Sequence, residues 1–138
     1  MADKNFTVLN LLDLDLKGHN SLNLRCVSGR RGLVRKITIP DLNRPGLALS
    51  GFYEAFAYQR CQLFGHGEVA YLNKLLEENK EEYVRKLFTY EIPCCIFSGN
   101  LEPPKEFVEM ADEADCPILL TDLESTAFST RLLRVLSD

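Results

Sequence analysis

The chain has 138 residues, of which 46% are hydrophobic and 26% are charged, and its formal net charge is -4. This size and composition predict one globular domain over residues 1–138 with a sizeable core. No window is apolar enough for a membrane span, and the polar start MADKNFTVLN does not resemble a signal peptide, so a cytoplasmic location without membrane contact is expected.

The first third of the chain predicts one helix and two strands. Leucines at helical spacing favour a short helix over residues 7–16, although their partial alternation also permits a strand. Residues 22–27 alternate apolar and polar side chains, residues 28–32 carry the glycines of a turn, and residues 36–39 are typical of a second strand. The two strands are therefore expected to form a hairpin.

A turn and an aromatic run follow. The sequence Arg44-Pro45-Gly46 predicts a type II turn, because proline fixes φ and Gly46 can adopt the left-handed conformation. After it come four aromatic residues, for which packing in the core or against a neighbouring domain is the expected role: Phe52, Tyr53, Phe56 and Tyr58.

The remaining two thirds alternate strands and helices. Three short apolar runs predict strands: Cys61–Phe64, Cys94–Phe97 and Ile118–Leu120. Helices are expected from about Glu68 to Leu87 with a break near residues 78–80, after Pro103-Pro104, and from about Ser125. This βαβαβα order predicts an α/β fold with a largely parallel sheet and flanking helices.

Five cysteines lie in or beside apolar runs: Cys26, Cys61, Cys94, Cys95 and Cys116. Their odd number and apolar surroundings favour reduced thiols that pack as small hydrophobic groups. The order His66-Gly67-Glu68 and then Pro93-Cys94-Cys95 is similar to the zinc-deaminase pattern H-x-E and P-C-x-x-C. The second thiolate of that pattern would stand at Phe97, so no metal site is expected.

Side chains suited to catalysis are few. Neither of the two histidines, His19 and His66, has a nucleophile pattern beside it, and the carboxylates lie in runs typical of solvated helix faces. The chain contains no G-x-x-x-x-G-K-[ST] phosphate-binding loop. No catalytic residue and no cofactor are expected in this chain.

A basic segment stands out in an otherwise acidic chain. Five residues define this basic segment: Arg25, Arg30, Arg31, Arg35 and Lys36. Arg44 follows the segment. Such a segment favours an anionic ligand, an acidic partner or a domain contact, and the alternative is that these side chains only provide solubility. Nucleic acid is not an expected partner, because aromatic residues are not interleaved and the whole chain is acidic.

Two loops are candidate ligand sites. In open α/β sheets, ligands bind beyond the carboxyl ends of the strands, where Gly65-His66-Gly67 and Ser98-Gly99-Asn100 are expected. The first loop runs into a helix amino terminus, whose backbone N–H groups favour anions. These loops and Arg44 are the predicted ligand or partner contacts, and the alternative is that the glycines only form turns.

Several short motifs occur in a distinctive order. The most specific lie within residues 44–72: Arg44-Pro45-Gly46-Leu47, Gly51-Phe52, Gln62-Leu63 and Glu68 through Leu72. Others precede and follow them: Gly32-Leu33-x-Arg35-Lys36-Ile37-Thr38, Pro93-Cys94-x-Ile96, Leu101-Glu102-Pro103-Pro104 and Pro117-Ile118-Leu119-x-Thr121. With these motifs the chain resembles, over nearly its whole length, the amino-terminal domain of bacterial HPr kinase/phosphorylase.

The resemblance implies a non-catalytic regulatory or assembly domain whose fold is similar to the amino-terminal domain of Mur ligases. Full-length members of that family use ATP with magnesium, or pyrophosphate, to phosphorylate a serine of the phosphocarrier HPr in carbon-source regulation, and they also reverse the reaction. They act through a carboxy-terminal P-loop kinase domain, which is absent from this chain, and they assemble as hexamers. The partners implied are therefore that kinase domain, HPr and further copies. The alternative is a free-standing module that binds a small anionic or nucleotide-sugar-like ligand.

Overall fold

The computed structural model describes residues 5–18 and 21–137. Its elements follow one another along the chain in this order: α1 (Val8–Leu16), β1 (Arg25–Ser28), the 3-10 helix η1 (Arg30–Val34), β2 (Leu42–Asn43), α2 (Gly46–Leu49), β3 (Cys61–Phe64), α3 (His66–Glu77), α4 (Glu81–Leu87), β4 (Cys95–Phe97), α5 (Lys105–Glu113), β5 (Ile118–Leu120) and α6 (Ser125–Ser137).

A five-stranded sheet with the order β1-β5-β4-β3-β2 runs through the middle of the molecule. Strands β2 to β5 are parallel, and β1 is antiparallel to β5 at one edge. The strands β3 and β4 are buried along their whole length, as is typical of parallel sheets that are covered on both faces. The predicted α/β fold with a largely parallel sheet is confirmed.

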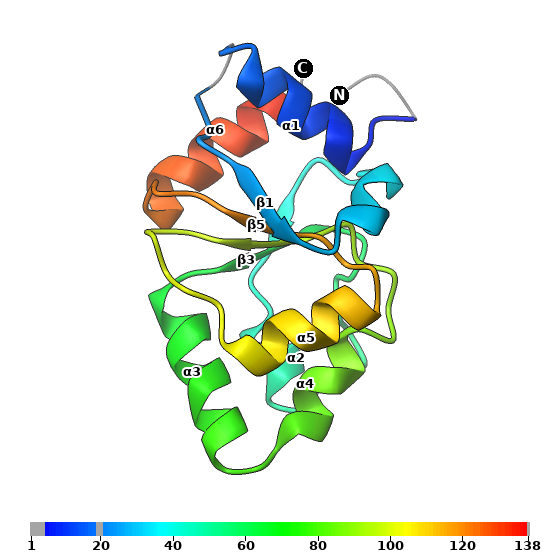
Figure 1. Cartoon of the computed structure of the whole chain (residues 1–138), viewed down its shortest axis with the longest axis vertical. Helices are drawn as coiled ribbons and strands as arrows, with labels where there is room; N and C mark the ends of the chain where they lie inside the picture. Colours follow the sequence, from blue (N-terminus) through cyan, green and yellow to red (C-terminus); the bar gives the residue numbers. More distant parts are fainter. Residues whose placement is uncertain (1–4, 19–20, 138) are drawn as a thin grey trace.

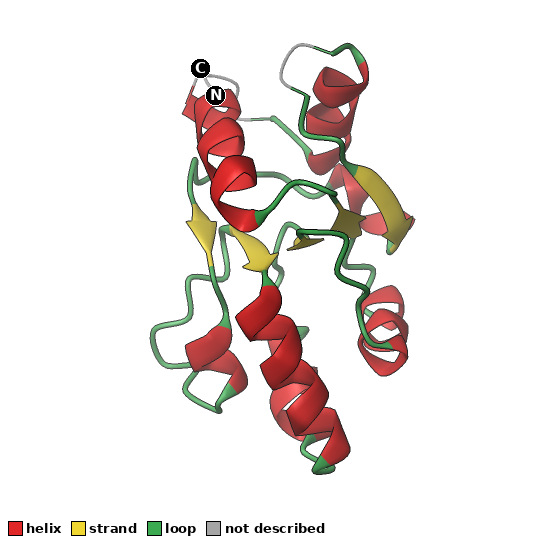
Figure 2. Cartoon of the chain, turned by 90° about the vertical axis from the view of Figure 1, so that its left-hand side faces the viewer, coloured by secondary structure: helices red, strands yellow, loops and turns green. Residues whose placement is uncertain are grey.

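Helices cover both faces of the sheet: α1 and α6 lie on one side, and α2 to α5 lie on the other (Figures 1 and 2). Because side chains alternate along a strand, Ile96 packs on the α1/α6 face and its neighbour Phe97 on the opposite face. There the rings of Phe97 and Phe64 stack at a centroid distance of 4.6 Å, and Phe107 from α5 meets both rings edge-on. The sheet therefore separates two packed cores.

Most predicted helices are present. Thr7 begins α1, because its hydroxyl accepts a hydrogen bond from the backbone N–H of Asn10 at 3.1 Å. The predicted break between two helical segments separates α3 from α4. Helix α3 begins two residues before Glu68, at His66. No helix within residues 5–18 and 21–137 is long and apolar enough to cross a membrane.

The predicted hairpin between residues 22–27 and 36–39 is wrong. Strand β1 pairs with β5, and η1 follows it directly. The residues after η1 contact the start of the chain instead, through a bridge between Lys36 and Thr7. The hairpin does not form because η1 carries the chain away from β1, and β1 pairs instead with the apolar strand β5, whose other edge pairs with β4.

Two glycines explain this change of direction. Gly29 has a φ of 69°, and a Cβ there would lie 2.0 Å from the carbonyl oxygen of Cys116. A Cβ on Gly32 would lie 1.9 Å from the carbonyl oxygen of Asp115. The turn after β1 therefore packs backbone against backbone on the connection between α5 and β5, and only glycine permits this approach.

The predicted type II turn at residues 44–46 is also wrong. Pro45 has φ and ψ values of -86° and 21°, and Gly46 is not left-handed but begins α2. The backbone N–H of Leu49 donates to the carbonyl of Pro45 at 2.9 Å. Ala48 and Leu49 are buried, and a helical turn directs both side chains into the core.

All five cysteines are free thiols, with Cys26 half-buried and the other four buried. The pKa of the Cys94 thiol is raised by its hydrogen bond with Cys61 and by burial. Burial and a hydrogen bond with Cys116 raise the pKa of Cys95 on the opposite face of the sheet. These thiols are protonated at neutral pH and pack as apolar groups.

Candidate functional site

The carboxyl ends of the parallel strands bring together residues that are distant in sequence. Arg44 follows β2, Gly65 follows β3 and Ser98 follows β4, while α6 begins at Ser125 shortly after β5. Because the strands are parallel, these ends meet at one edge of the sheet. We call the polar side chains that meet there the strand-end network: Arg44, His66, Glu68, Ser98, Glu124 and Ser125.

Glu68 is the centre of the strand-end network. Its Oε1 atom accepts a hydrogen bond from the backbone N–H of Gly65 at 2.8 Å and pairs with Nη2 of Arg44 at 3.0 Å. The Glu68 side chain is only 15% exposed, whereas that of Arg44 is 52% exposed. The amino terminus of α3 therefore already holds a carboxylate from the same helix, in the position that favours an external anion.

Two serines connect the network to β4 and α6. The hydroxyl of Ser98 is buried and lies 2.7 Å from the hydroxyl of Ser125, which also accepts a hydrogen bond from Arg44 at 3.3 Å. A Cβ on Gly65 would lie 2.3 Å from Nη2 of Arg44 and 2.6 Å from Oγ of Ser125. A side chain at position 65 would therefore displace the Arg44 guanidinium and the Ser125 hydroxyl from their contacts in the network.

The outer part of the network is open to solvent. Nε2 of His66 lies 3.3 Å from Oε2 of Glu124, and the two side chains are 69% and 68% exposed. Gly99 has a φ of 62°, and a Cβ there would lie 3.0 Å from both carboxylate oxygens of Glu124. Asn100 is also left-handed, whereas Gly67 has no neighbour that a Cβ would meet.

The chemistry of this arrangement is limited. The hydroxyls of Ser98 and Ser125 contact each other, and that of Ser125 also contacts Arg44, which cannot accept a proton from a nucleophile. Within the described part of the chain, no cluster of three or more His, Cys, Asp or Glu side chains could hold a metal ion. The role of Arg44, Gly65, His66, Gly67, Ser98, Gly99 and Asn100 in ligand or partner contact stays a prediction.

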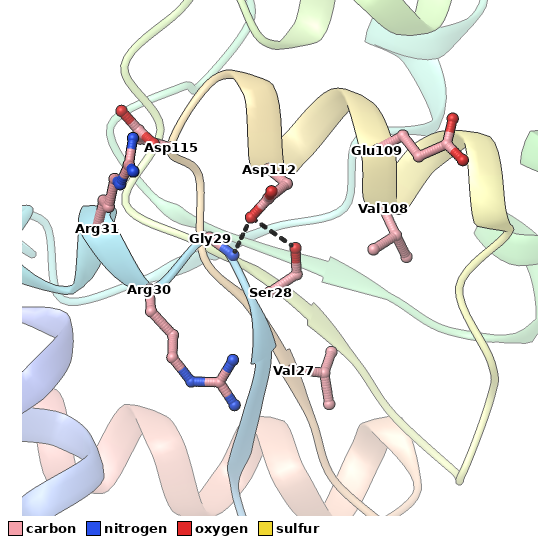
Figure 3. Close-up of a pocket in the computed structure, with 9 residues that line it drawn as sticks. All are labelled: Val27, Ser28, Gly29, Arg30, Arg31, Val108, Glu109, Asp112 and Asp115. Atoms are coloured by element: carbon pink, nitrogen blue, oxygen red, sulfur yellow. Dashed lines mark hydrogen bonds between the residues drawn. The ribbon is translucent and has the colours of Figure 1, made fainter.

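The basic segment has separate structural surroundings. Arg35 donates to the carbonyls of Ile92 and Ala114, both at 2.7 Å, and Arg30 donates to the carbonyl of Cys26 at 2.9 Å. Figure 3 shows Arg30 and Arg31 on different sides of the turn after β1. Arg25 and Lys36 line two further hollows of the surface.

The sequence predictions did not assign roles to Glu68, Glu124 and Ser125. A signal for Glu68 was present, because a glutamate three residues after a helix cap is typical of a capping box. Glu124 and Ser125 join the site only through the position of β5 in the sheet. His19 lies outside the described residues.

Comparison with known families gives a match over most of the chain. The family model described as HPr Serine kinase N terminus matches residues 10–136. Proteins named HPr kinase/phosphorylase are similar to the chain: the one from Treponema pallidum is 54% identical over 93% of the chain, and the one from Leptospira biflexa is 40% identical over 88%. The matched regions are 40% and 38% of those proteins, so the chain spans about two fifths of their length.

A solved structure has a similar fold. It contains the CBS and DRTGG domains of the regulatory region of a Clostridium perfringens pyrophosphatase, complexed with the activator diadenosine tetraphosphate. The TM-score is 0.59 at 16% sequence identity, and the match covers 96% of this chain and 51% of the other. This likeness supports the α/β fold.

Proposed function

Because the chain belongs to the HPr serine kinase N-terminal family, we propose that it is a non-catalytic domain that supports the assembly and regulation of an HPr kinase/phosphorylase. In this proposal, ATP and magnesium bind to another part of such an enzyme, as does the serine of HPr that is phosphorylated. The contacts of this chain are then with the kinase domain and with further copies, up to a hexamer.

The observation that carries the proposal is the internal pairing of the strand-end network. The loops beyond the parallel strands are where this fold class binds substrates. In this chain, the carboxylate of Glu68 binds both Gly65 N–H and Arg44, and the hydroxyls of Ser98 and Ser125 bind each other. These contacts stabilise the loops, and among the described residues neither serine hydroxyl contacts a histidine or a carboxylate, which supports a structural role.

The surface around α2 supports a role in assembly. Leu47 is 66% exposed and Phe52 is 46% exposed, and the backbone N–H of Phe52 donates to the carbonyl of Leu47 at 3.3 Å. Tyr58 and Tyr83 are each 37% exposed and lie nearby: the Tyr83 ring lies beside Gly51, and the Tyr58 ring contacts Phe56, which lines the same hollow as Leu47 and Phe52. We call Leu47, Phe52, Tyr58 and Tyr83 the α2 patch. Exposed apolar groups of this kind mark protein contacts, and the kinase domain of such an enzyme is the occupant we propose.

A chimaera tests this proposal. In the Treponema pallidum relative, the matched region of 128 residues is replaced by this chain or is deleted. The molar mass of each protein is measured by light scattering, and the rate of HPr phosphorylation is measured with ATP. We expect the chimaera to assemble and respond to effectors as the parent does, and the deletion to lose assembly or regulation.

Variants of the α2 patch make the test specific. We expect Leu47→Ser with Phe52→Ser in the chimaera to weaken assembly, whereas Leu16→Ser, which changes a leucine of 84% exposure outside the patch, leaves it unchanged. A deletion protein with the mass, rate and regulation of the parent would show that the domain has neither role. Assembly unaffected by the two patch substitutions would show that the contact lies elsewhere.

A further inference from the structure

An open groove lies between the edge strand β1 and helix α5. Its volume is about 630 Å³, and its lining includes Arg25, Val27, Leu101, Lys105, Val108 and Leu120. A neighbouring hollow of about 540 Å³ shares Val27 and Val108 with it, and Figure 3 shows these two side chains between the strand and the helix. Volumes of this size are typical of small-molecule sites.

The floor of the groove is apolar. Val27, Leu101, Val108 and Leu120 are partly buried and pack against the core of the α2–α5 face. Because β1 is the edge strand, α5 covers its face only in part, and one side of these residues stays open to solvent. An apolar ligand group would bury this remaining surface, and that burial favours binding.

Two cations stand beside this floor without a partner. Arg25 extends from the same face of β1 as Val27, because side chains alternate along a strand. Lys105 begins α5. Among the described residues, the side chains of Arg25 and Lys105 form no ion pair and no hydrogen bond, and Glu102 is the carboxylate that lines the same groove. The groove therefore has an excess of positive charge at its rim.

We propose that this groove binds a small amphipathic anion. Its aromatic or short aliphatic body packs on Val27, Val108 and Leu120, and its carboxylate or phosphate group lies near Arg25 and Lys105. Such a ligand satisfies both features of the groove at once, whereas an inorganic anion leaves the floor exposed and a neutral apolar molecule leaves the cations unpaired. The site is separate from the strand-end network, and binding there goes beyond the function proposed above.

The binding test uses this chain and four probes in an NMR titration. Phenyl phosphate and 3-phenylpropionate carry both a ring and an anionic group, inorganic phosphate lacks the ring, and 3-phenylpropanol lacks the charge. We expect one or both aromatic anions to shift the methyl resonances of Val27, Leu101, Val108 and Leu120 saturably. Inorganic phosphate and the alcohol are expected to bind at least about tenfold more weakly.

Matched variants locate the anionic group. Arg25→Gln combined with Lys105→Gln should weaken binding about tenfold, because two exposed cations that contact one anion are lost. Lys36→Gln removes an exposed cation of the basic segment outside the groove and should leave affinity unchanged. The proposal is overturned if neither aromatic anion shifts these methyl groups up to millimolar concentration, or if the double variant binds as the unchanged chain does.

Discussion

Arg35 is the residue of the basic segment whose removal should cost the most stability. Its guanidinium donates from two nitrogens to the carbonyls of Ile92 and Ala114, both at 2.7 Å. Ile92 precedes β4, and Ala114 ends α5 before β5. One side chain therefore ties the segment after η1 to the amino ends of two neighbouring strands.

The magnitude follows from these two bonds. A hydrogen bond to a charged group contributes about 1.5–3 kcal/mol, and the lower end applies because Arg35 is only half-buried. Arg35→Met should therefore lower the free energy of unfolding by about 3 kcal/mol. Arg35→Lys keeps the charge but lacks the planar fork, so it can serve one carbonyl and should cost about 1.5 kcal/mol.

Urea unfolding followed by circular dichroism measures these losses, with thermal unfolding as a second measurement. For a domain of this size, about 3 kcal/mol corresponds to a decrease of about 9 °C in Tm. Arg31→Met is the matched control, because the Arg31 side chain is exposed and, among the described residues, forms no hydrogen bond or ion pair. Its effect should stay within about 0.5 kcal/mol.

Two results would refute this reasoning. Equal stability of Arg35→Met and Arg31→Met would mean that the two carbonyls are satisfied as well by water as by the guanidinium. Equal losses for Arg35→Lys and Arg35→Met would mean that a single retained hydrogen bond contributes nothing. That result would contradict the assumption that each guanidinium nitrogen contributes about half of the stabilisation.

Three further predictions concern the turn after β1, the amino terminus of α3 and the buried thiols. Gly29→Ala should destabilise the chain by more than about 3 kcal/mol in urea unfolding, since its Cβ would overlap the Cys116 carbonyl and φ is 69°. Gly67→Ala, at an open position within α3, should instead stabilise the chain by up to about 1 kcal/mol. Glu68→Ala should lose about 1 kcal/mol of helix capping and should free the Gly65 N–H. Calorimetry should then show that phosphate binds the variant more tightly than the unchanged chain. Equal binding would contradict the view that the Glu68 carboxylate occupies an anion position. Because the folded chain raises the pKa of Cys94 and Cys95 above their ordinary value of 9.0, the unfolded chain releases these protons first. The contribution of the two thiols to stability should therefore be constant below about pH 9 and fall as the pH rises above it. Unfolding free energies measured at neutral and alkaline pH check this, and Cys94→Ala should show a smaller alkaline loss.

The sequence predicted the part of the fold in which local signals agree. In residues 61–137, short apolar runs alternate with amphipathic segments, and prolines or glycines stand at the boundaries. Each of these signals is local, and the right-handed crossover rule then determines the parallel order. The family resemblance, carried by the order of the motifs, is confirmed by the match to residues 10–136.

The wrong predictions concern segments whose conformation is determined by long-range contacts. Strand β1 pairs with Leu119 and Leu120, almost one hundred residues away, although a neighbouring apolar run offered a hairpin. The sequence Arg44-Pro45-Gly46 is typical of a turn, but Gly46 begins a helix, because a helical turn buries Ala48 and Leu49. Local propensity is a weak guide when tertiary packing competes with it.

The sequence predicted where the loops of the candidate site lie but not which side chains contact one another there. The loops at Gly65 and Ser98 were expected at the sheet edge, and the topology places them there. The two contacts that pair the loops were not predicted: Glu68 accepts a hydrogen bond from the Gly65 N–H at 2.8 Å, and the hydroxyls of Ser125 and Ser98 lie 2.7 Å apart. Distances of that kind follow from the packed structure and not from spacing along the chain.

The most direct measurement of the central proposal is the mass of HPr after incubation with this chain, ATP and magnesium, and in a second reaction with pyrophosphate. The full-length Treponema pallidum relative serves as the positive control. A non-catalytic domain predicts HPr of unchanged mass with the chain and phosphorylated HPr with the relative. Phosphorylation of a serine of HPr by the chain itself would contradict the proposal.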